Sequence, residues 1–581
     1  MPTTYDGLLL DQGGALLNVM SSAYGARGDG AWGDDASISS GSATMSTVAS
    51  SFASGDVGKT ITIRGAASGG LALTTTISGY TSSTQVTLAT TAGASVAGAA
   101  FVFGTDDTAA LASVFAAVAS AGRGTAFFPA GNFMISGAMS IPTNTVLHFA
   151  GGARLKALSR LSDGSGMLSL SQVSGVTLIN PTIDGSNDVF DLSAGKDAAQ
   201  YYGVWIDRCS EIAIIGGHVF ALPLGDSGVD GGDGILIFDS TNSLVPSEFW
   251  RVIGVEMSGN SRNGMSVVSG RYGVISENHI HDNGFNGLDI EPNNANDVVV
   301  QVVVSANVVR ANSSEGIVAK AGDAFTVGPV GLVGNTIEEN GKSGIDVQWF
   351  TNVPIVGNVI RNNAQVVSGS PTGSGIYLYH AAGAIIVGNH VSGANQQYCI
   401  KDQDGTSPSV IAEGNQLVSW YSCGTCGQYT LDGGAARVNN LGWSAGVPTA
   451  SEWEVGNVVQ NTNDNTFWIK DANDTMRQLW AGRLVALSDA ATIALDASTG
   501  TSFQVTIGGN RTIGAPTNPA IGQRITLLVQ QDATGGRTLS WNGVFKQGWS
   551  NSGNGAHKRT SISFVYDGTN WNQESAQAPY V

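Results

Sequence analysis

The sequence is poor in charge and contains few basic residues. Charged side chains make up 12% of its 581 residues, about half the usual share of a globular chain. The 27 Lys and Arg residues are outnumbered by 45 Asp and Glu, so the formal net charge is −18. Because phosphate contacts need clustered Lys and Arg, this balance argues against nucleic acid as a partner.

The sequence also lacks a membrane-spanning run and a cysteine framework. No stretch reaches the roughly 18 apolar residues of a membrane span, so no membrane insertion is expected. The segment after Met1 has no basic start and contains Asp6 and Asp11, which predicts no signal peptide. Cys423 and Cys426 have the spacing of half a zinc site, but no second pair accompanies them among the four cysteines. We therefore expect no metal and no cofactor.

Glycine is abundant instead, with 79 residues, about twice the usual share. Hydrophobic residues reach 42%, which argues against disorder. Abundant Gly with Ser, Thr, Asn and Val, and with little Lys or Glu, is typical of stacked short strands joined by tight turns. The composition therefore predicts an all-β protein.

A repeated phrase indicates how those strands are arranged. Gly followed by apolar, any and apolar residues recurs at intervals of 23 to 31 residues, and a Gly-Asn phrase or its equivalent recurs with it. The glycines are Gly203, Gly234, Gly264, Gly287, Gly316, Gly344 and Gly375, and the asparagines are Asn278, Asn307, Asn335, Asn358, Asn389 and Asn415. Two strand-like phrases with one drifting period predict a solenoid in which each coil is one repeat. The Asn residues are expected to hold the coils in register.

The chain divides into five parts by pattern. Residues 1–35 form an N-terminal leader and the start of the solenoid, and residues 36–104 read as a small inserted β module. Residues 105–440 contain a capping helix, which Asp106 or Asp107 begins and Gly122 ends, followed by the solenoid. Residues 441–480 read as a connector, and residues 481–581 as a β-sandwich because short strands alternate with turn residues.

Three phrases before the repeats carry a family resemblance: Tyr24-Gly-Ala-Arg-Gly-Asp-Gly, Asp106-Asp-Thr-Ala-Ala-Leu and Ala126-Phe-Phe-Pro-Ala-Gly. They resemble the N-terminal signature of pectate-lyase-like right-handed parallel β-helix proteins. The order of β-helix, connector and terminal β-sandwich resembles bacteriophage tailspikes, which digest or bind polysaccharides of the host surface. The resemblance implies a homotrimer in the virion tail, made in the host cytoplasm without a signal peptide. It also implies that the N-terminus attaches to the phage tail or baseplate and that the sandwich serves trimerisation or glycan binding.

The phase of the repeat predicts which side chains face outward. Positions +1 and +3 after each repeat glycine are apolar, so +2 and +4 lie on the outer face. That outer row carries aromatic residues at both ends and carboxylates between them, which suits a sugar chain with its apolar faces and polar rim. The expected substrate contacts are Trp205, Asp207, Lys320, Gln348, Trp349, Tyr377, Tyr379 and His380. The alternative is a surface covered by a neighbouring subunit.

Three carboxylates in this row are the candidate catalytic residues: Asp289, Glu291 and Asp346. Asp289 and Glu291 are two residues apart, roughly 6.6 Å along a strand, and Asp346 stands two coils from Asp289, roughly 10 Å away. Inverting glycosidases hold their carboxyl groups about 6.5–9.5 Å apart, and retaining ones about 5 Å. The spacing predicts an inverting glycoside hydrolase in which mutual repulsion raises the pKa of at least one acid.

Other interpretations remain open at this point. The carboxylates could bind only turn amides or water. A polysaccharide lyase would use Tyr377, Lys320 or His380 as base, although the carboxylates would repel an anionic sugar. A spike that binds the host glycan without cleaving it is a third possibility.

Overall fold

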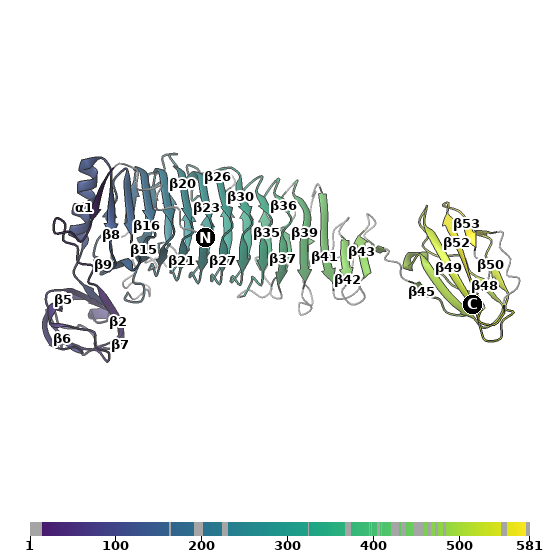
Figure 1. The fold of residues 1–581 in the computed structure, drawn as a ribbon, viewed down its shortest axis with the longest axis horizontal. Helices are drawn as coiled ribbons and strands as arrows, with labels where there is room; N and C mark the ends of the chain where they lie inside the picture. The colour runs from purple at the N-terminus through teal and green to yellow at the C-terminus, as the bar shows by residue number, and fades with distance from the viewer. Residues whose placement is uncertain are drawn as a thin grey trace. The chain divides into compact units, whose positions relative to one another are not determined.

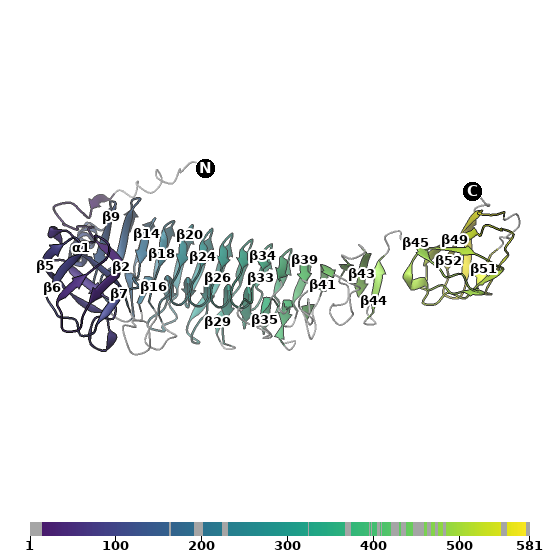
Figure 2. The same ribbon diagram turned by 90° about the horizontal axis from the view of Figure 1, so that it is seen from below.

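The computed structural model describes residues 14–161, 164–190, 201–223, 231–322, 325–365, 373–393, 396, 398–403, 407, 409–419, 429–430, 437–444, 458–461, 466–470, 475–479, 484–547 and 555–576. The chain forms two compact units, residues 1–440 and 441–581. Strands account for nearly all of the regular structure (Figures 1 and 2). Among the described residues, no helix is both long and apolar enough to cross a membrane.

The first unit is a parallel β-helix whose coils each contribute three strands, as the repeat predicts. The first sheet contains β10 (Met139–Ser140), β13 (Ser165–Ser171), β16 (Tyr201–Asp207), β19 (Ile235–Phe238), β22 (Met265–Val267), β25 (Leu288–Ile290), β28 (Ile317–Lys320), β32 (Ile345–Gln348), β35 (Ser374–Tyr379), β38 (Tyr398–Asp402) and β40 (Tyr429–Thr430). The second face contains β1 (Ala15–Asn18), β8 (Gly124–Phe128), β11 (Thr145–Phe149), β14 (Ser174–Ile179), β17 (Ser210–Ile215), β20 (Ser247–Ile253), β23 (Gly270–Ser276), β26 (Val298–Ser305), β29 (Thr326–Val327), β30 (Val330–Val333), β33 (Pro354–Val356) and β36 (Ile385–Val387). The third face contains β9 (Gly131–Ile135), β12 (Ala153–Ala157), β15 (Thr182–Asp184), β18 (His218–Phe220), β21 (Glu256–Ser258), β24 (His279–His281), β27 (Val308–Arg310), β31 (Thr336–Glu338), β34 (Val359–Arg361) and β37 (His390–Gly393). β39 (Ile411–Ser419) pairs with both β36 and β37.

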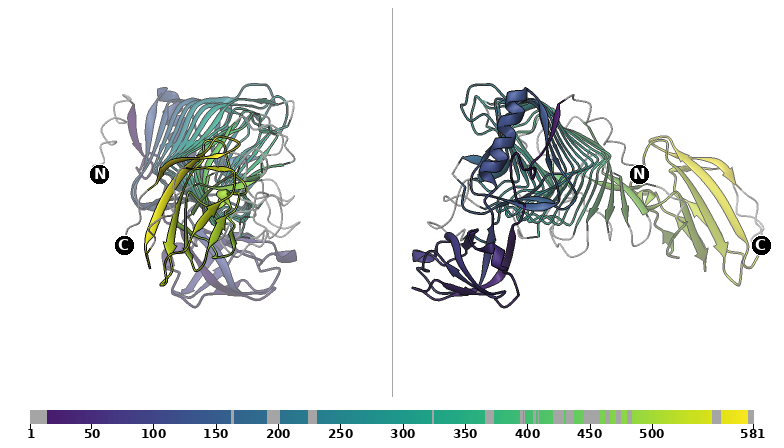
Figure 3. Two further views of the ribbon diagram at one scale, coloured as in Figure 1. Left: turned by 90° about the vertical axis from the view of Figure 1, so that its right-hand side faces the viewer. Right: turned by 60° about the vertical axis from the view of Figure 1, so that its left-hand side comes forward.

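The repeat glycines and the apolar positions after them build the core. Every +1 and +3 residue of the seven repeats is fully buried in one continuous hydrophobic cluster, from Val204 to Leu378. The glycine is needed for close approach: a Cβ at Gly264 would lie 2.4 Å from the Ile280 side chain and 2.7 Å from the Gly287 carbonyl oxygen. The strands of successive coils therefore stack one behind another (Figure 3).

Two ladders of buried side-chain amides hold the coils in register. In the predicted ladder, each amide nitrogen donates to the next Asn at 2.9–3.0 Å, from Asn278 to Asn415. Each Asn also accepts from the backbone N–H of the preceding Asn. The sequence analysis did not identify the second ladder, which joins Asn260, Asn283, Asn312, Asn340, Asn363 and Gln396.

A single helix, α1 (Thr108–Ala121), covers the first coils, where it buries Leu111, Val114, Phe115 and Val118 in the solenoid core. Asp106 accepts from the Thr108 N–H at 3.0 Å, and Gly122 ends the helix in the left-handed conformation. The Asp107 carboxylate instead accepts from the N–H groups of Arg27 and Gly28, so it fastens the N-terminal segment to the helix.

A closed β-barrel interrupts the chain before α1 and corresponds to the expected inserted module. Its strands are β2 (Ala31–Ile38), β3 (Thr44–Ser46), β6 (Gln85–Leu88), β5 (Leu73–Ser82), β4 (Thr60–Ile63) and β7 (Val96–Gly104), in this order around the barrel. It has a core of its own, in which Phe52 contacts Phe101 and Phe103. The strands begin at Ala31, a few residues before the predicted boundary.

The second unit ends in two sheets that share one core, as expected of a sandwich. One sheet contains β45 (Leu484–Ala486), β47 (Ser502–Ile507), β49 (Arg524–Gln531), β52 (Arg559–Tyr566), β53 (Trp571–Ala576) and β51 (Phe545–Lys546), and the other contains β46 (Thr492–Ile493), β48 (Arg511–Ile513) and β50 (Leu539–Trp541). From β45 to β50 the chain alternates between the sheets and pairs in parallel, so this part is a short solenoid. The antiparallel strands β52 and β53 close it.

The predicted connector lies largely outside the described residues, and so do Trp453, Cys423 and Cys426. Its described strands are β41 (Arg437–Ser444), β42 (Val458–Asn461), β43 (Thr466–Lys470) and β44 (Met476–Leu479). β42, β43 and β44 form an antiparallel meander.

We predict that Asn307→Ala lowers the apparent melting temperature, because it leaves buried polar groups of three coils without hydrogen-bond partners. The Asn307 side chain accepts from Asn278 and donates to Ile275 and Asn335. The free energy of unfolding is expected to fall by roughly 3 kcal/mol, since each unsatisfied buried polar group costs about 1–3 kcal/mol. Calorimetry at a fixed scan rate measures it, with Asn296→Ala as an exposed control; equal melting of the two variants would contradict the ladder's role.

Candidate functional site

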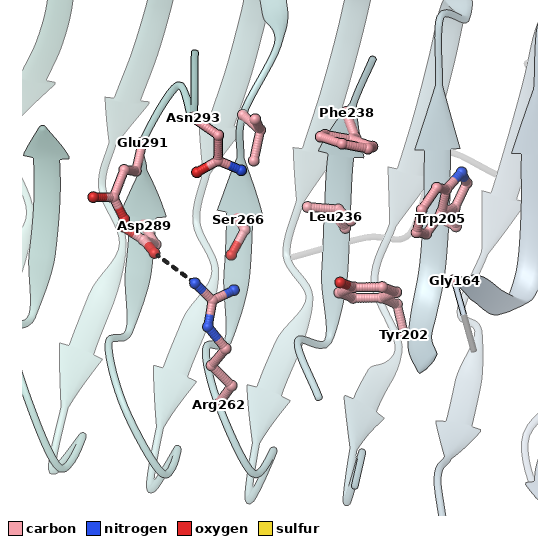
Figure 4. Close-up of a pocket in the computed structure, with 11 residues that line it drawn as sticks. Gly164, Tyr202, Trp205, Leu236, Phe238, Arg262, Ser266, Asp289, Glu291 and Asn293 are labelled. Carbon is pink, nitrogen blue, oxygen red and sulfur yellow. Dashed lines mark ion pairs between the residues drawn. The ribbon is translucent and has the colours of Figure 1, made fainter. Parts of the chain in front are cut away.

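The outer face of the first sheet carries a cavity of about 280 Å³. Its lining comes from the coils of β13 to β25 and consists of Gly164, Tyr202, Trp205, Leu236, Phe238, Arg262, Ser266, Val268, Asp289, Glu291 and Asn293. Figure 4 shows the aromatic residues at one end and the carboxylates at the other. The structure thus brings together three of the expected site residues: Trp205, Asp289 and Glu291.

Asp289 is the buried carboxyl of the cavity, with 3% of the residue exposed. Burial and, next to it, the charge of the nearby Glu291 raise its pKa from 3.8 to about 7, against the opposing effect of Arg262. Oδ2 accepts from the Asn263 amide at 3.0 Å, whereas Oδ1 has no hydrogen-bond partner among the described residues. Oδ1 is itself buried, and a carboxyl group in this environment holds a proton near neutral pH.

A second buried acid, Asp233, competes with Asp289 for the same guanidinium. Arg262 Nη1 lies 3.0 Å from Asp233, while its other terminal nitrogen lies 3.7 Å from Asp289 (Figure 4). Asp233 also accepts from the Ser266 hydroxyl at 2.8 Å and the Asn263 N–H at 3.0 Å. The closer pair draws the positive charge away from Asp289, which leaves Asp289 easier to protonate.

Glu291 follows Asp289 by two residues on the same outer face and is partly exposed. Lys320, one coil further on, forms an ion pair with it at 3.2 Å, and Glu291 is the main cause of a raised pKa of Lys320. Lys320 was expected to contact substrate, and in the structure its ammonium group is paired with Glu291.

The aromatic end of the cavity is a small hydrophobic cluster on the outer face. Tyr202, Leu236 and Val268 are buried in it, with Trp205 and Phe238 packed against them. Trp205 contacts Tyr202 and Phe238 edge to face, with ring centroids 5.2 Å and 5.7 Å apart. These rings form a partly exposed apolar wall at the end of the cavity opposite the two carboxyl groups (Figure 4).

Asp346 occupies the same sheet position as Asp289, two coils away, with Val318 between them. Burial raises its pKa to about 7 as well, with Glu315 adding to the effect and Gln348 opposing it. Gln348 donates to the Asp346 carboxylate at 3.0 Å. Asp346 and Gln348 do not line the cavity that contains Asp289.

The other expected substrate contacts also lie outside this cavity. Trp349, Tyr379 and His380 form an aromatic cluster further along the sheet, in which Trp349 stacks on His380 at 3.8 Å. Tyr377 pairs in register with Asp346 and is 7% exposed. Asp207 is buried and ion-paired with Arg208; burial raises its pKa, but hydrogen bonds from Arg208, Ser240 and Ser171 outweigh this and lower it.

The residues that the sequence analysis missed are Arg262, Asp233, Tyr202 and Asn293. The first three precede the repeat glycines by one or two positions: Arg262 and Asp233 lie in turns that lead into the first sheet, and Tyr202 lies at the start of β16. An Arg in such a turn, with an Asp in the corresponding turn one coil earlier, could have indicated the ion pair. No group of three His, Cys, Asp or Glu residues with the arrangement of a metal site occurs among the described residues.

Two segments match known protein families. Residues 250–417 match the family described as right handed beta helix region, and residues 495–571 match the one described as putative phage tail fibre C-terminal domain. These matches confirm the expected resemblance to tailspike-like proteins built on a right-handed parallel β-helix.

Solved structures with a similar fold include enzymes and phage proteins. The A-module of mannuronan C-5 epimerase AlgE4 of Azotobacter vinelandii is 19% identical, over 54% of this chain and 91% of its own, with a TM-score of 0.42. The Dettilon tailspike protein is 16% identical over 82% and 76%, with a TM-score of 0.37. A double mutant of the tailspike protein of E. coli bacteriophage HK620, in complex with a pentasaccharide, is 11% identical over 82% and 89%, with a TM-score of 0.38. No curated protein compared with the chain matches it.

We predict that Asp289→Asn and Asp346→Asn raise the melting temperature at pH 8. A carboxyl whose pKa is about 7 in the fold and 3.8 otherwise opposes folding increasingly as the pH rises from about 4 to 7. The neutral amide removes this penalty, so the gain should vanish near pH 3.5. Asp207→Asn is the matched control: its folded pKa is lowered, so this variant should be less stable than the parent at pH 8. Lower melting temperatures of both Asn variants at pH 8 would contradict the raised pKa values.

Proposed function

We propose that the protein binds and depolymerises a bacterial surface polysaccharide, such as a capsule, exopolysaccharide or O-antigen, by inverting glycoside hydrolysis. The observation that carries the proposal is Asp289: a buried carboxyl with a raised pKa and an unpaired oxygen, beside Glu291 in a cavity with an aromatic wall. A carboxyl group that stays protonated near neutral pH is what a glycosidase needs as general acid.

In the proposed reaction, Asp289 protonates the glycosidic oxygen as the bond to the anomeric carbon breaks. Glu291 takes a proton from the water that attacks the opposite face of the sugar. Two residues of extended backbone span roughly 6.6 Å, and the mechanism requires the two carboxyl groups to stand about 6.5–9.5 Å apart to leave room for this water. Asp346 is roughly twice the coil spacing from Asp289, about 10 Å, and lines a different part of the face.

The lining of the cavity favours hydrolysis over elimination. Tyr202, Trp205 and Phe238 offer apolar surface to a pyranose ring. The two cations nearest the acids, Arg262 and Lys320, are both ion-paired to carboxylates. An elimination would need a cation to neutralise the carboxylate of a uronic acid, and these side chains are already engaged.

The match of residues 495–571 to a phage tail fibre domain supports a place in a virion tail. There the protein would act as a homotrimer that is attached to the tail or baseplate through its N-terminus, and the C-terminal domain would serve trimerisation or glycan binding. The remaining expected contacts, from Lys320 to His380, would then bind more distant sugar units of the same chain.

Asp289→Asn and Glu291→Gln should each reduce depolymerisation of a responsive polysaccharide by at least about 100-fold, because each removes a proton-transfer group. Size-exclusion chromatography and new reducing ends measure cleavage on a panel of capsules and O-antigens, with Val303→Ala as control. Proton NMR of the first product should show the inverted anomer. New ultraviolet absorbance from an unsaturated sugar would instead indicate a lyase. Unchanged polysaccharide length across the panel would indicate a protein that binds the glycan without cleaving it.

Asp233→Asn should move the alkaline limb of the activity profile about one unit to lower pH. Without the Asp233 charge, Arg262 acts on Asp289 alone and stabilises its ionised form. The measurement is kcat/KM against pH, with Asp282→Asn, which changes an exposed carboxylate just after β24, as the control. An unshifted limb in the Asp233 variant would contradict the role of Asp289 as general acid.

A further inference from the structure

A second cavity, of about 460 Å³, lies on a different face of the solenoid. It opens on the sheet of β14, β17, β20 and β23, of which β20 and β23 are labelled in Figure 1. Its lining consists of Asn144, Gly175, Thr177, Glu211, Ile212, Ala213, Phe249, Trp250, Arg251, Tyr272 and Val274. None of these residues lines the cavity that contains Asp289.

Two stacked aromatic rings form one wall of this second cavity. Phe249 and Tyr272 lie on neighbouring coils with ring centroids 5.0 Å apart and an angle of 15° between their planes. Phe249 is 57% exposed and Tyr272 41%, although most rings of this size are largely buried. Because the separation matches the coil spacing of about 4.8 Å, the rings stack along the solenoid axis and the far face of Phe249 looks toward the preceding coils.

The backbone holds these rings outward at a cost. Glu211, Phe249 and Tyr272 all have positive φ, of 56°, 53° and 56°, and Gly175 on the coil before them has φ 65°. Left-handed backbone is unfavourable for Phe and Tyr, by about 1–3 kcal/mol each. Glu211 precedes Phe249 at the same sheet position, and Gly175 one coil further back has no side chain, so space is left around the Glu211 side chain next to Phe249.

Charged side chains of both signs stand around this space. Neither Glu211 nor Arg251 makes a side-chain hydrogen bond or ion pair with any of the described residues. Both are exposed, and Ala213 pairs in register with Arg251, which places Arg251 beside the floor of the cavity. An acceptor and a donor next to an open ring face suit a ligand with hydroxyl groups and an apolar face.

We propose that this second cavity is a separate, non-catalytic saccharide-binding site. A pyranose ring stacks on the outer face of Phe249 and continues the stack that Tyr272 begins. Its hydroxyl groups accept from Arg251 and donate to Glu211. The choice of a saccharide rests on the proposed function, while the site rests on the second cavity alone. Two sites on different faces would let one polymer remain bound while another segment is cleaved.

The test uses the full chain with Asp289→Asn, so that the polymer is not consumed. The probe is a set of size-fractionated oligosaccharides, released by mild acid from the panel polysaccharide to which the wild-type protein binds. Calorimetric titration should detect two sites per chain. Adding Phe249→Ala should weaken one of them about tenfold, and Phe249→Tyr should restore it. Trp205→Ala should affect only the other site, and Val303→Ala, an exposed apolar residue on the same sheet as Phe249, should affect neither.

Each outcome bears on the proposal separately from the proposed function. Binding that Trp205→Ala removes and Phe249→Ala leaves intact overturns the second site and leaves the catalytic one standing. Binding that depends on Phe249, without depolymerisation by the wild-type protein, supports the second site and overturns the enzyme. A smaller particle mass for the Phe249→Ala variant in sedimentation shows that this face joins copies of the chain, which overturns the proposal. Absence of any binding overturns both.

Discussion

Hydrogen bonds between parallel coils fix where each side chain of the solenoid stands. Ser266, Asp289, Val318, Asp346 and Tyr377 follow one another in register along the first sheet. The two amide ladders maintain this register at two corners of every coil from Asn283 to Asn363. Each coil therefore repeats the same backbone arrangement but presents a different side chain at this position. These side chains follow one another along the sheet in the order of the coils.

The same stacking creates the chemistry of the site. Outer-face side chains about 4.8 Å apart shield one another, so a carboxyl in this row loses water even though it points away from the core. Asp289 is desolvated by its neighbours on the face, and its charge is disfavoured further by Glu291. Asp233 forms the closer ion pair with Arg262, the nearest cation. Exposure of the sheet as a whole and burial of single residues on it are thus compatible.

The sequence predicted the fold well because the repeat encodes it directly. Glycine marks the close approach of coils, and the alternation after it separates core from surface, so Val204 and Trp205 were assigned to opposite sides correctly. The site was predicted only in part. The period of the repeat predicts on which coil and at which strand position Asp289 lies. It does not predict the contribution of the turn residues Asp233 and Arg262, which lie before the repeat phrase. It also gives no measure of mutual burial: Asp207 occupies an outer position like Glu291, yet Arg208 and two serines enclose its carboxylate. The second amide ladder was missed because no shared phrase marks its residues: of the six, only Asn260 follows a Gly.

The chain enters and leaves the barrel at neighbouring points, and the barrel also packs on the solenoid, where the Thr62 hydroxyl donates to the Leu158 carbonyl at 2.6 Å. Asp29, just before the barrel, accepts from the N–H and hydroxyl of Thr105, just after it, at 2.9 Å and 3.0 Å. Lys59 from inside the barrel reaches the same carboxylate at 2.9 Å. The two ends of a segment of more than seventy residues thus meet at one side chain. The insertion leaves the coil continuous, because Asp29 bridges in parallel to Asn132 and Asp106 bridges to Met134, so the backbone resumes beside the point where it left.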